Sequence, residues 1–567
     1  MALMEHSEYI SQKVTQSENN TLLINSSILL AAALLFIPFL GGVHLFDWDE
    51  INFAESAREM IVSKDYLNVQ INFISFWEKP PLFIWMQVLS MKIFGINEFA
   101  ARFPNAICGI VSLLVIFNIG RKTVSTKFGL VWLFLYAGSI LPFFYFKSGI
   151  IDPWFNLFIF LGVFGFYSYC QNREPQIWYA AGSGFFIGLA ILTKGPVAFL
   201  IFALTAGIYL VYKRFSTRIK IKDLAIFILF LAFTGGFWFI LQILQGHFSV
   251  IADFIIYQIR LFRTEDAGHG GFLFYHFVIL FIGVFPASVF ALPVLLGSKY
   301  GNEQQKNLYT WMLILFWVVL LLFTLVKTKI VHYSSMCYFP LTFMAAWSIY
   351  NNDARKKFIH KLVKPLIVGT GILLALLIGL LTYIDHFKAF VIEHHLLHDP
   401  FAVKCLSASG EWKGFEVVAG VVLLAGIITY IAAGRKKEQM AVYALTGFMV
   451  IFIFLSMVMI VPRVEAYSQR AAVEFFQSVS DKDVYLETVG YKSYTHLFYG
   501  KIKDHENSLS KDEKWLLTGR IDKDAYFSVK VTSKENFISQ YPDTEYLYEK
   551  NGFVFFKRSK QVVLNDK

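Results

Sequence analysis

The residues best suited to chemistry lie at the two ends of one long polar stretch, residues 47–81. Asp49 and Glu50 stand near its start, and Glu78 and Lys79 stand near its end. A carboxylate can take a proton from an attacking hydroxyl, and a lysine can neutralise an anionic leaving group. A polar connection of about 35 residues is far longer than ordinary loops, and such loops usually carry function.

Further ionisable residues follow other apolar runs. They are Asp152 in KSGIIDPW, Lys194 in LTKGP, Arg260, Arg263 and His269 after residues 224–244, and Lys329 and Tyr333 after residues 308–325. Ionisable groups near hydrocarbon are costly, so groups of both signs that converge on one membrane surface indicate a functional site.

The composition indicates a membrane protein. Of 567 residues, 56% are hydrophobic and 16% are charged, which excludes an ordinary soluble multidomain protein. The net charge of +10 does not indicate nucleic-acid binding, because the basic residues fall mainly in short loops between apolar runs, where they set topology. The four cysteines have neither metal-site nor disulfide spacing.

Apolar runs predict about 13 membrane helices between residues 22 and 461. The apolar segment 82–94 is short and contains Gln87 and Lys92, so we expect it to lie at the interface. The remaining spans then put most basic loops on the side of residues 1–21, which the positive-inside rule assigns to the cytoplasm. The loop 47–81 is therefore expected outside, and a spanning 82–94 segment is rejected because it would turn the basic loops outward.

Residues 462–567 have a different composition, with roughly a third of them charged and no run long enough to span. Strand-like runs at 483–488, 525–531 and 545–557 alternate with helix-like stretches at 465–478 and 533–541. The predicted fold is an all-α polytopic membrane protein with a small extracytoplasmic α/β domain at its C-terminal end. We expect it in the cytoplasmic membrane.

Group transfer from a lipid-anchored phosphate needs this set of residues. Arginine, lysine and tyrosine can bind a phosphate leaving group, while a carboxylate activates the attacking hydroxyl. A sugar linked to a polyprenyl phosphate fits, because it carries an activated anomeric carbon to a side where nucleotide sugars are absent.

Several motifs carry a family resemblance in the same order. The runs DWDEINFAESAREMIVSKDY and FWEKPPLFIWMQVLSMKIFGINEFAARFPNAICG resemble the first outer loop of the GT-C membrane glycosyltransferases of the aminoarabinose transferase and protein O-mannosyltransferase group. SGIIDPW, LTKGP, DAGHGGFLFYH and KTKIVHY extend the similarity over most of the membrane part. It implies an inverting transferase that moves one sugar from a polyprenyl phosphate to a lipid A-type glycolipid, a glycan or a protein.

The resemblance also implies roles for single residues. Asp49, with Glu50 beside it, matches the catalytic carboxylate, and Asp152 matches a second acidic position. The expected donor-phosphate contacts are Lys79, Lys194, Arg260 or Arg263, Lys329 and Tyr333. Glu78 and His269 resemble a pair that can hold a divalent cation, but one carboxylate and one imidazole make an incomplete site, so no cofactor is required. DEINFAE departs from the usual DEARYAE of aminoarabinose transferases at Asn52 and Phe53.

Simpler interpretations stay open for some of these residues. Asp49 and Asp152 are also suited to the first turn of a helix, and Lys194 and Lys329 are also suited to anchoring helix ends at the interface. His394, His395 and His398 have no acidic partner in the sequence and are expected on the surface. The alternative functions are a polyprenyl-lipid flippase without catalysis, although no repeat is visible, and a membrane scaffold whose C-terminal domain binds a partner.

Overall fold

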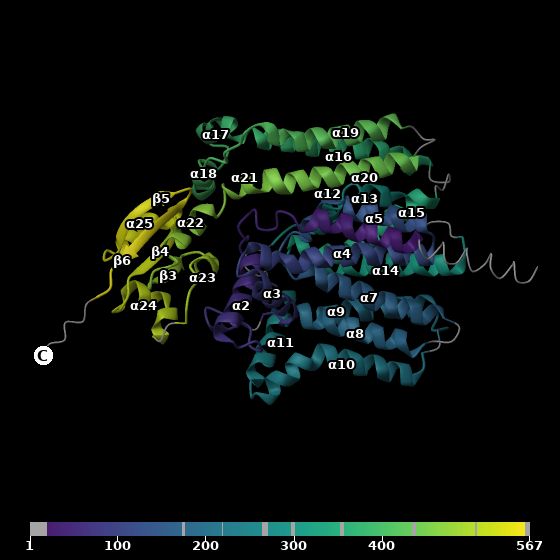
Figure 1. The fold of residues 1–567 in the computed structure, drawn as a ribbon, viewed down its shortest axis with the longest axis horizontal. Helices are drawn as coiled ribbons and strands as arrows, with labels where there is room; N and C mark the ends of the chain where they lie inside the picture. The colour runs from purple at the N-terminus through teal and green to yellow at the C-terminus, as the bar shows by residue number, and fades with distance from the viewer. Residues whose placement is uncertain are drawn as a thin grey trace, which may run out of the picture.

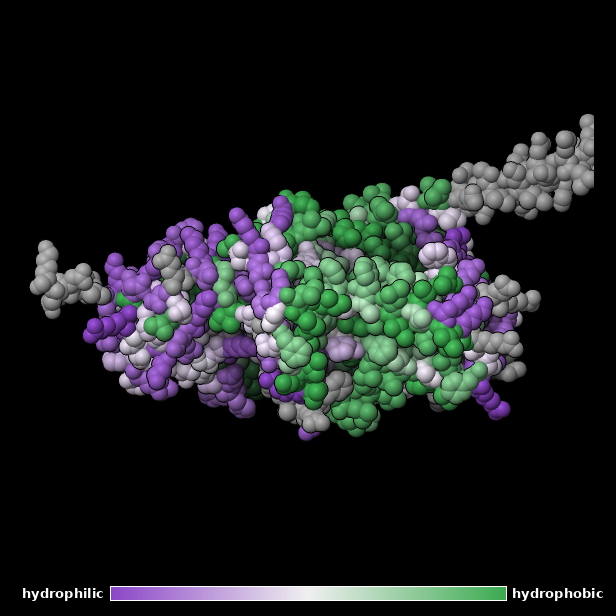
Figure 2. All heavy atoms as spheres, turned by 90° about the horizontal axis from the view of Figure 1, so that it is seen from below, coloured by the Kyte–Doolittle hydropathy of each residue, from purple (hydrophilic) through white to green (hydrophobic). Residues whose placement is uncertain are grey.

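The computed structural model describes residues 20–561, apart from 77, 173–175, 218, 264–269, 296, 298–300, 352–356, 434–437 and 505–506. Long helices run side by side, and the C-terminal domain sits at one end of the bundle beside α2 (Figure 1). Apolar side chains gather over the bundle, between a hydrophilic region at the C-terminal domain and a smaller one at the opposite end (Figure 2). This pattern fits a protein that crosses a bilayer.

Within the described residues, eight helices are long and apolar enough to cross a membrane, and a bent pair makes a ninth candidate. The predicted polytopic all-α fold is therefore confirmed. The bundle consists of the helix Asn20–Phe36, α4 (Glu98–Thr123), α5 (Thr126–Ala137), α6 (Ile140–Tyr145), α7 (Asp152–Gln171), α8 (Ile177–Lys194), α9 (Val197–Tyr212), α10 (Ile221–Leu244), α12 (Tyr275–Gly283), α13 (Ala287–Leu295), α14 (Glu303–Leu325), α15 (Tyr338–Asn351), α16 (Lys357–Thr382), α19 (Val418–Ala432), α20 (Glu438–Leu455) and α21 (Val461–Glu465).

One predicted span is broken. The apolar run at residues 277–296 is long enough for one span, but it forms two helices, α12 and α13, which meet at a bend of 119°. Pro286 lies in the break, and proline has no amide hydrogen with which to continue a helical ladder. The two halves contact opposite ends of α14. The helix α12 contacts the short helix η1 (Val331–Cys337), which follows the end of α14, and the carbonyl of Val294 in α13 accepts a hydrogen bond from the hydroxyl of Tyr309, near the start of α14. The segment therefore still crosses the bundle.

The first loop folds into α2 (Asp49–Ser63), a small hairpin of β1 (Gln70–Ile71) and β2 (Ile74–Ser75), and α3 (Leu82–Phe94). The 13-residue α3 packs against α2 and α4. The buried Glu59 carboxylate on α2 accepts the backbone N–H groups of Asn72 and Phe73 at 2.6 and 2.8 Å. The hairpin is thereby tied to the helix that begins at Asp49.

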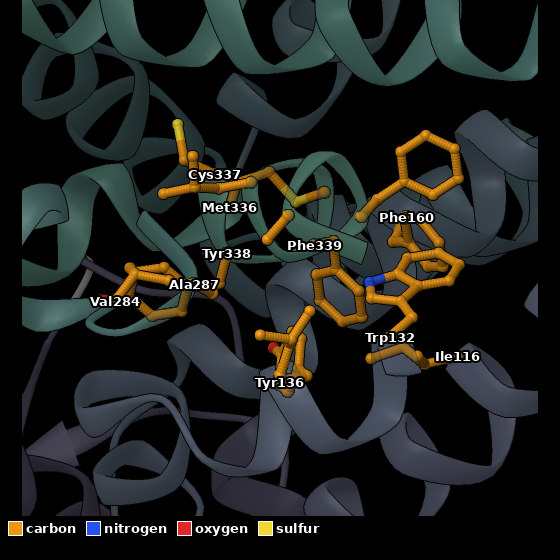
Figure 3. Close-up of a cluster of buried hydrophobic side chains, with 14 of the residues drawn as sticks. Ile116, Trp132, Tyr136, Phe160, Val284, Ala287, Met336, Cys337, Tyr338 and Phe339 are labelled. Carbon is orange, nitrogen blue, oxygen red and sulfur yellow. The ribbon is translucent and has the colours of Figure 1, made fainter. Parts of the chain in front are cut away.

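An aromatic core fixes η1. Phe160 of α7 stacks on Phe339 of α15 with ring centroids 4.4 Å apart, and Trp132 of α5 lies against Phe160 at 6.0 Å (Figure 3). Met336 of η1 and Tyr338, which begins α15, belong to the same cluster. Close packing of this kind leaves little freedom to the turn that precedes it.

The C-terminal domain has a four-stranded sheet in the order β3-β4-β6-β5, with a parallel β3–β4 pair and antiparallel β4–β6 and β5–β6 pairs. Its elements are α22 (Arg470–Val479), β3 (Tyr485–Val489), α23 (Thr495–Tyr499), α24 (Glu513–Thr518), β4 (Ala525–Lys530), α25 (Lys534–Gln540), β5 (Glu545–Lys550) and β6 (Phe553–Arg558). The predicted α/β domain is confirmed. The run at 545–557 is a hairpin rather than one strand, because Asn551 and Gly552 both take positive φ, 48° and 85°.

Candidate active site

A cavity of about 770 Å³ opens at the end of the bundle that carries the C-terminal domain. Its walls come from the first loop, the start of α7, the end of α8, η1, α11 (Phe248–Arg263) and the C-terminal domain. The predicted site residues that line it are Asp49, Glu50, Glu78, Lys79, Asp152, Lys194, Arg260 and Tyr333. Residues predicted from separate motifs thus converge on one space.

Two carboxylates face each other across this cavity. Asp49 begins α2 and its side chain is 43% exposed, whereas Asp152 begins α7 and its side chain is 3% exposed. His332 lies between them, with Nε2 3.7 Å from Asp49 Oδ2 and 3.9 Å from Asp152 Oδ2. Lys194 Nζ donates to the other oxygen of Asp152 at 2.6 Å. The exposed Asp49 can approach a substrate hydroxyl, while Asp152 is engaged by the protein.

Cationic groups line the same cavity beside these carboxylates. Lys194 Nζ lies 5.2 Å from the ring of Tyr333, and Lys79 Nζ and the guanidinium of Arg260 each lie 5.1 Å from the ring of Tyr257. Burial lowers the pKa of Lys79; Glu78 opposes this shift, and the nearby Lys194 adds to it. An incoming anion such as a phosphate would favour the charged form of Lys79.

The chain is similar in sequence and in structure to several known proteins. A family model described as dolichyl-phosphate-mannose-protein mannosyltransferase matches residues 78–238. A relative from Pectobacterium carotovorum named undecaprenyl phosphate-alpha-4-amino-4-deoxy-L-arabinose arabinosyl transferase is 25% identical over 440 residues, 74% of this chain and 73% of the relative. A protein of Aquifex aeolicus is 28% identical over 371 residues, 64% of this chain and 80% of its own length.

The fold is also found in a solved structure. ArnT from Cupriavidus metallidurans bound to undecaprenyl phosphate matches with a TM-score of 0.73 at 18% identity, over 94% of this chain and 97% of that one. The chain is a membrane glycosyltransferase that resembles the GT-C group. It resembles the aminoarabinose transferases, and it uses a lipid-linked sugar.

Two predicted roles in the transferase do not fit the geometry. Glu50 is buried, and both of its oxygens are engaged by Arg102 at 2.9 and 2.8 Å and by the N–H groups of Phe46 and Gly149. Burial opposes ionisation, but Arg102 and these donors hold the pKa of Glu50 below its ordinary value. Glu50 therefore fixes the start of α2, and it has no lone pair directed at a substrate.

Lys329 does not face the cavity. Its buried ammonium donates to the carbonyls of Phe323, Thr324 and Val326 at 3.1, 2.7 and 2.6 Å, so it caps the C-terminal end of α14. Lys147 does the same for the helix Asn20–Phe36, where it donates to Phe36 at 3.2 Å. Lys329 is therefore engaged by a helix end and is not among the residues that line the cavity, so its contact with phosphate stays a prediction.

The remaining predicted residues can be placed only in part. His269 and the side chain of Arg263 lie outside the described residues. The described part of the chain contains no group of three or more metal-binding side chains. Glu78 lines the cavity and accepts a hydrogen bond from the Tyr257 hydroxyl at 3.0 Å. Asn52 also lines the cavity, is 7% exposed, and its Oδ1 has no hydrogen-bond partner.

The C-terminal domain clamps the segment that leads into Asp49. Gln469 accepts the N–H of Asp47 at 3.0 Å through Oε1 and donates through Nε2 to the carbonyl of Leu45. The Tyr499 hydroxyl accepts the N–H of Leu45 at 2.6 Å. Because the partners are more than 400 positions apart in the chain, sequence reasoning gave no sign of this contact.

The same domain supplies part of the cavity wall. Lys492 and Tyr494 line it, and the Trp48 indole donates to the carbonyl of Lys492 at 2.9 Å. The backbone N–H of Tyr494 donates to Asp47 Oδ1 at 3.3 Å. Burial raises the pKa of Asp47 to about 6. Sequence analysis also assigned no role to His332, although it stands next to Tyr333 in KTKIVHY and that position could have indicated one.

Proposed function

We propose that this transferase moves a single sugar from a polyprenyl phosphate to an acceptor hydroxyl at the outer face of the cytoplasmic membrane. In this proposal the N-terminus is cytoplasmic, and the catalytic loop 47–81 and the C-terminal domain are extracytoplasmic. The acceptor is a lipid A-type glycolipid, a glycan or a protein. The names of the Pectobacterium relative and of the Cupriavidus structure support undecaprenyl phosphate as the carrier.

The observation that carries the proposal is the pairing of an exposed carboxylate with two lysines in one cavity. Asp49 is the base that takes the proton of the acceptor hydroxyl. Lys79 and Lys194, with Tyr333 and Arg260, bind the phosphate and stabilise the charge that develops on it. Inversion follows if the acceptor attacks the anomeric carbon directly from the side opposite the phosphate.

Asp152 has a supporting role in this scheme. It is buried and bound to Lys194 at 2.6 Å, so it holds that ammonium toward the phosphate and limits its freedom. The scheme needs no cofactor. Glu78 with His269 is the candidate pair for a divalent cation, which would neutralise further phosphate charge.

Comparative mass spectrometry tests the function. Lipid A, glycans and envelope proteins are extracted from cells with and without the gene and from cells complemented with the wild-type gene. The proposal predicts that one of these fractions loses a single sugar-sized mass increment in the deletion strain and regains it on complementation. Identical spectra in all three fractions, together with an unchanged pool of polyprenyl-phosphate-linked sugar, would contradict it.

A further inference from the structure

His332 occupies the centre of the carboxylate edge, and the fold holds it there. Its carbonyl accepts a hydrogen bond from the Ser335 hydroxyl at 2.5 Å, and Ser335 in turn accepts one from Asn156 of α7 at 2.8 Å. The His332 side chain is 14% exposed and lines the cavity. An imidazole so placed can exchange a proton with either carboxylate after a small movement, and such contacts are often long in structures without substrate.

The surroundings of His332 are strongly charged. The titratable groups that face it are Asp49 from α2, Asp152 from α7, Lys194 from α8, Lys79 from the first loop, His276 from α12 and the adjacent Tyr333. Burial lowers the pKa of His332, Asp152 opposes that shift, and Lys194 adds to it. The imidazole is therefore neutral at pH 7 and its Nε2 can accept a proton.

We propose that His332 is a positioning residue that sets the separation of Asp49 and Asp152 and receives from Asp49 the proton that the acceptor hydroxyl gives up. This inference rests on the proposed function. It assigns a role to an imidazole whose Nε2 lies 3.7 Å from one carboxylate and 3.9 Å from the other.

The proton and electrons balance as follows. The acceptor oxygen forms a bond to the anomeric carbon and passes its proton to Asp49, while the bond from that carbon to the phosphate oxygen breaks and its electron pair stays on the oxygen. Asp49 gives the proton to Nε2 of His332, which becomes an imidazolium between two carboxylates. The proton then leaves to the released polyprenyl phosphate monoester or to water, and Asp49 is ready for the next acceptor.

The test uses the full chain, purified and placed in lipid vesicles. The substrate is the total lipid extract of cells that lack the gene, which contains both the unspent donor and the unmodified lipid acceptors, supplemented with their envelope fraction. Release of free polyprenyl phosphate and gain of a sugar-sized increment are followed by mass spectrometry from about pH 5 to about pH 8, the range over which histidine titrates.

Four variants make the result specific. His332→Gln keeps a polar side chain that cannot titrate, and His332→Ala leaves a space that free imidazole can enter. Asp47→Asn controls for the other group in the cavity wall that titrates in this range, since burial raises the pKa of Asp47 to about 6. His386→Gln removes an exposed histidine that is not part of the cavity wall.

The proposal predicts that wild-type turnover falls as the pH decreases, because a protonated His332 cannot take the proton from Asp49. His332→Gln should lower kcat about 100-fold, abolish the acid limb that Asp47→Asn and His386→Gln retain, and leave the donor KM within about twofold. Imidazole should restore part of the activity of His332→Ala. Binding of undecaprenyl phosphate to each variant reports whether the site is folded.

Results that contradict the role of His332 differ from results that contradict the proposed function. An acid limb that survives in His332→Gln, a raised KM with unchanged kcat, or a failure of imidazole to rescue a His332→Ala protein that still binds undecaprenyl phosphate would each overturn the role of His332. If the wild-type protein releases no polyprenyl phosphate from the extract at any pH, the proposed function itself fails, and the two outcomes are thus separated.

Discussion

The two ends of the first loop are held in different ways. At its start, Glu50 is locked to Arg102 of α4, and the segment before it is bound by Gln469 and Tyr499 of the C-terminal domain. At its end, Glu78 accepts a hydrogen bond from the hydroxyl of Tyr257 on α11, and Lys79 lies over the ring of the same residue. The start of the loop, here the carboxylate edge, is held by charge pairs and backbone hydrogen bonds, whereas the end of the loop, the proposed phosphate edge, holds Lys79 over an aromatic ring.

We therefore expect the start and the end of loop 47–81 to have different roles. A base must be placed accurately before the acceptor arrives, because small errors in the position of a reacting group reduce the rate strongly. A phosphate site can gain much of its order from the anion itself, since an anionic ligand favours the charged form of Lys79, which burial disfavours. Changes at the start of the loop should therefore lower kcat, and changes at its end should weaken donor binding.

The largest effect is expected for Asp49→Asn. The amide cannot take a proton, so kcat should fall by about 1,000-fold or more while undecaprenyl phosphate still binds. The measurement is turnover of the deletion-strain extract beside a binding assay for undecaprenyl phosphate. Asp481→Asn, at an exposed position of the C-terminal domain, is the matched control. Near-normal turnover in Asp49→Asn would show that another group is the base.

Lys194→Ala should act on the other edge. It removes a phosphate contact and leaves the buried Asp152 carboxylate without its 2.6 Å partner, so undecaprenyl phosphate should bind about 100-fold more weakly. Lys213→Ala, which removes a lysine from the C-terminal end of α9 away from the cavity, is the control. An unchanged affinity for undecaprenyl phosphate would place the donor phosphate elsewhere.

Gln469→Ala tests the contact between the C-terminal domain and the segment that precedes Asp49. Loss of its two hydrogen bonds to the segment before Asp49 should lower kcat about 10-fold and leave undecaprenyl phosphate binding intact. Gln477→Ala, at an exposed position on α22 of the same domain, should behave like the wild type. If Gln469→Ala instead weakened donor binding with kcat unchanged, the two ends of the loop would not have the separate roles described above.

Asn52→Leu should have the smallest effect, a decrease of about fivefold in kcat/KM. The Oδ1 of Asn52 is buried, lacks a partner and lines the cavity, and we expect it to accept a hydrogen bond from a sugar hydroxyl. Asn536→Leu, at an exposed position on α25, is the control. A gain in kcat/KM for Asn52→Leu would argue that this amide makes no contact with the donor.

The sequence predicted the class of fold and the location of most site residues, because hydropathy marks the spans and ionisable residues beside hydrocarbon are rare enough to be informative. It could not separate Lys194 from Lys329. Both follow apolar helices at the same end of the bundle, but Lys194 ends α8 and reaches Asp152 on α7, while Lys329 lies four residues after α14 and turns back onto its last carbonyls.

Sequence patterns also could not predict the contacts of Glu50 or those of the C-terminal domain. Asp49 and Glu50 are neighbours in sequence and both line the cavity, but successive positions on a helix point in different directions, so Asp49 is exposed while Glu50 is buried against Arg102. Trp48 and Lys492 are in contact across 444 positions, a pairing that depends on the whole bundle being folded. Local patterns carry no information about contacts of this kind.

The most direct test of the account is reconstitution of the purified full chain with a lipid-linked sugar. Vesicles that hold the wild-type protein and the deletion-strain extract should release free polyprenyl phosphate and add a sugar-sized increment to an acceptor in equal amounts, and Asp49→Asn vesicles should do neither. Movement of the lipid-linked sugar between leaflets with no cleavage of the sugar–phosphate bond would contradict the account and identify the protein as a flippase.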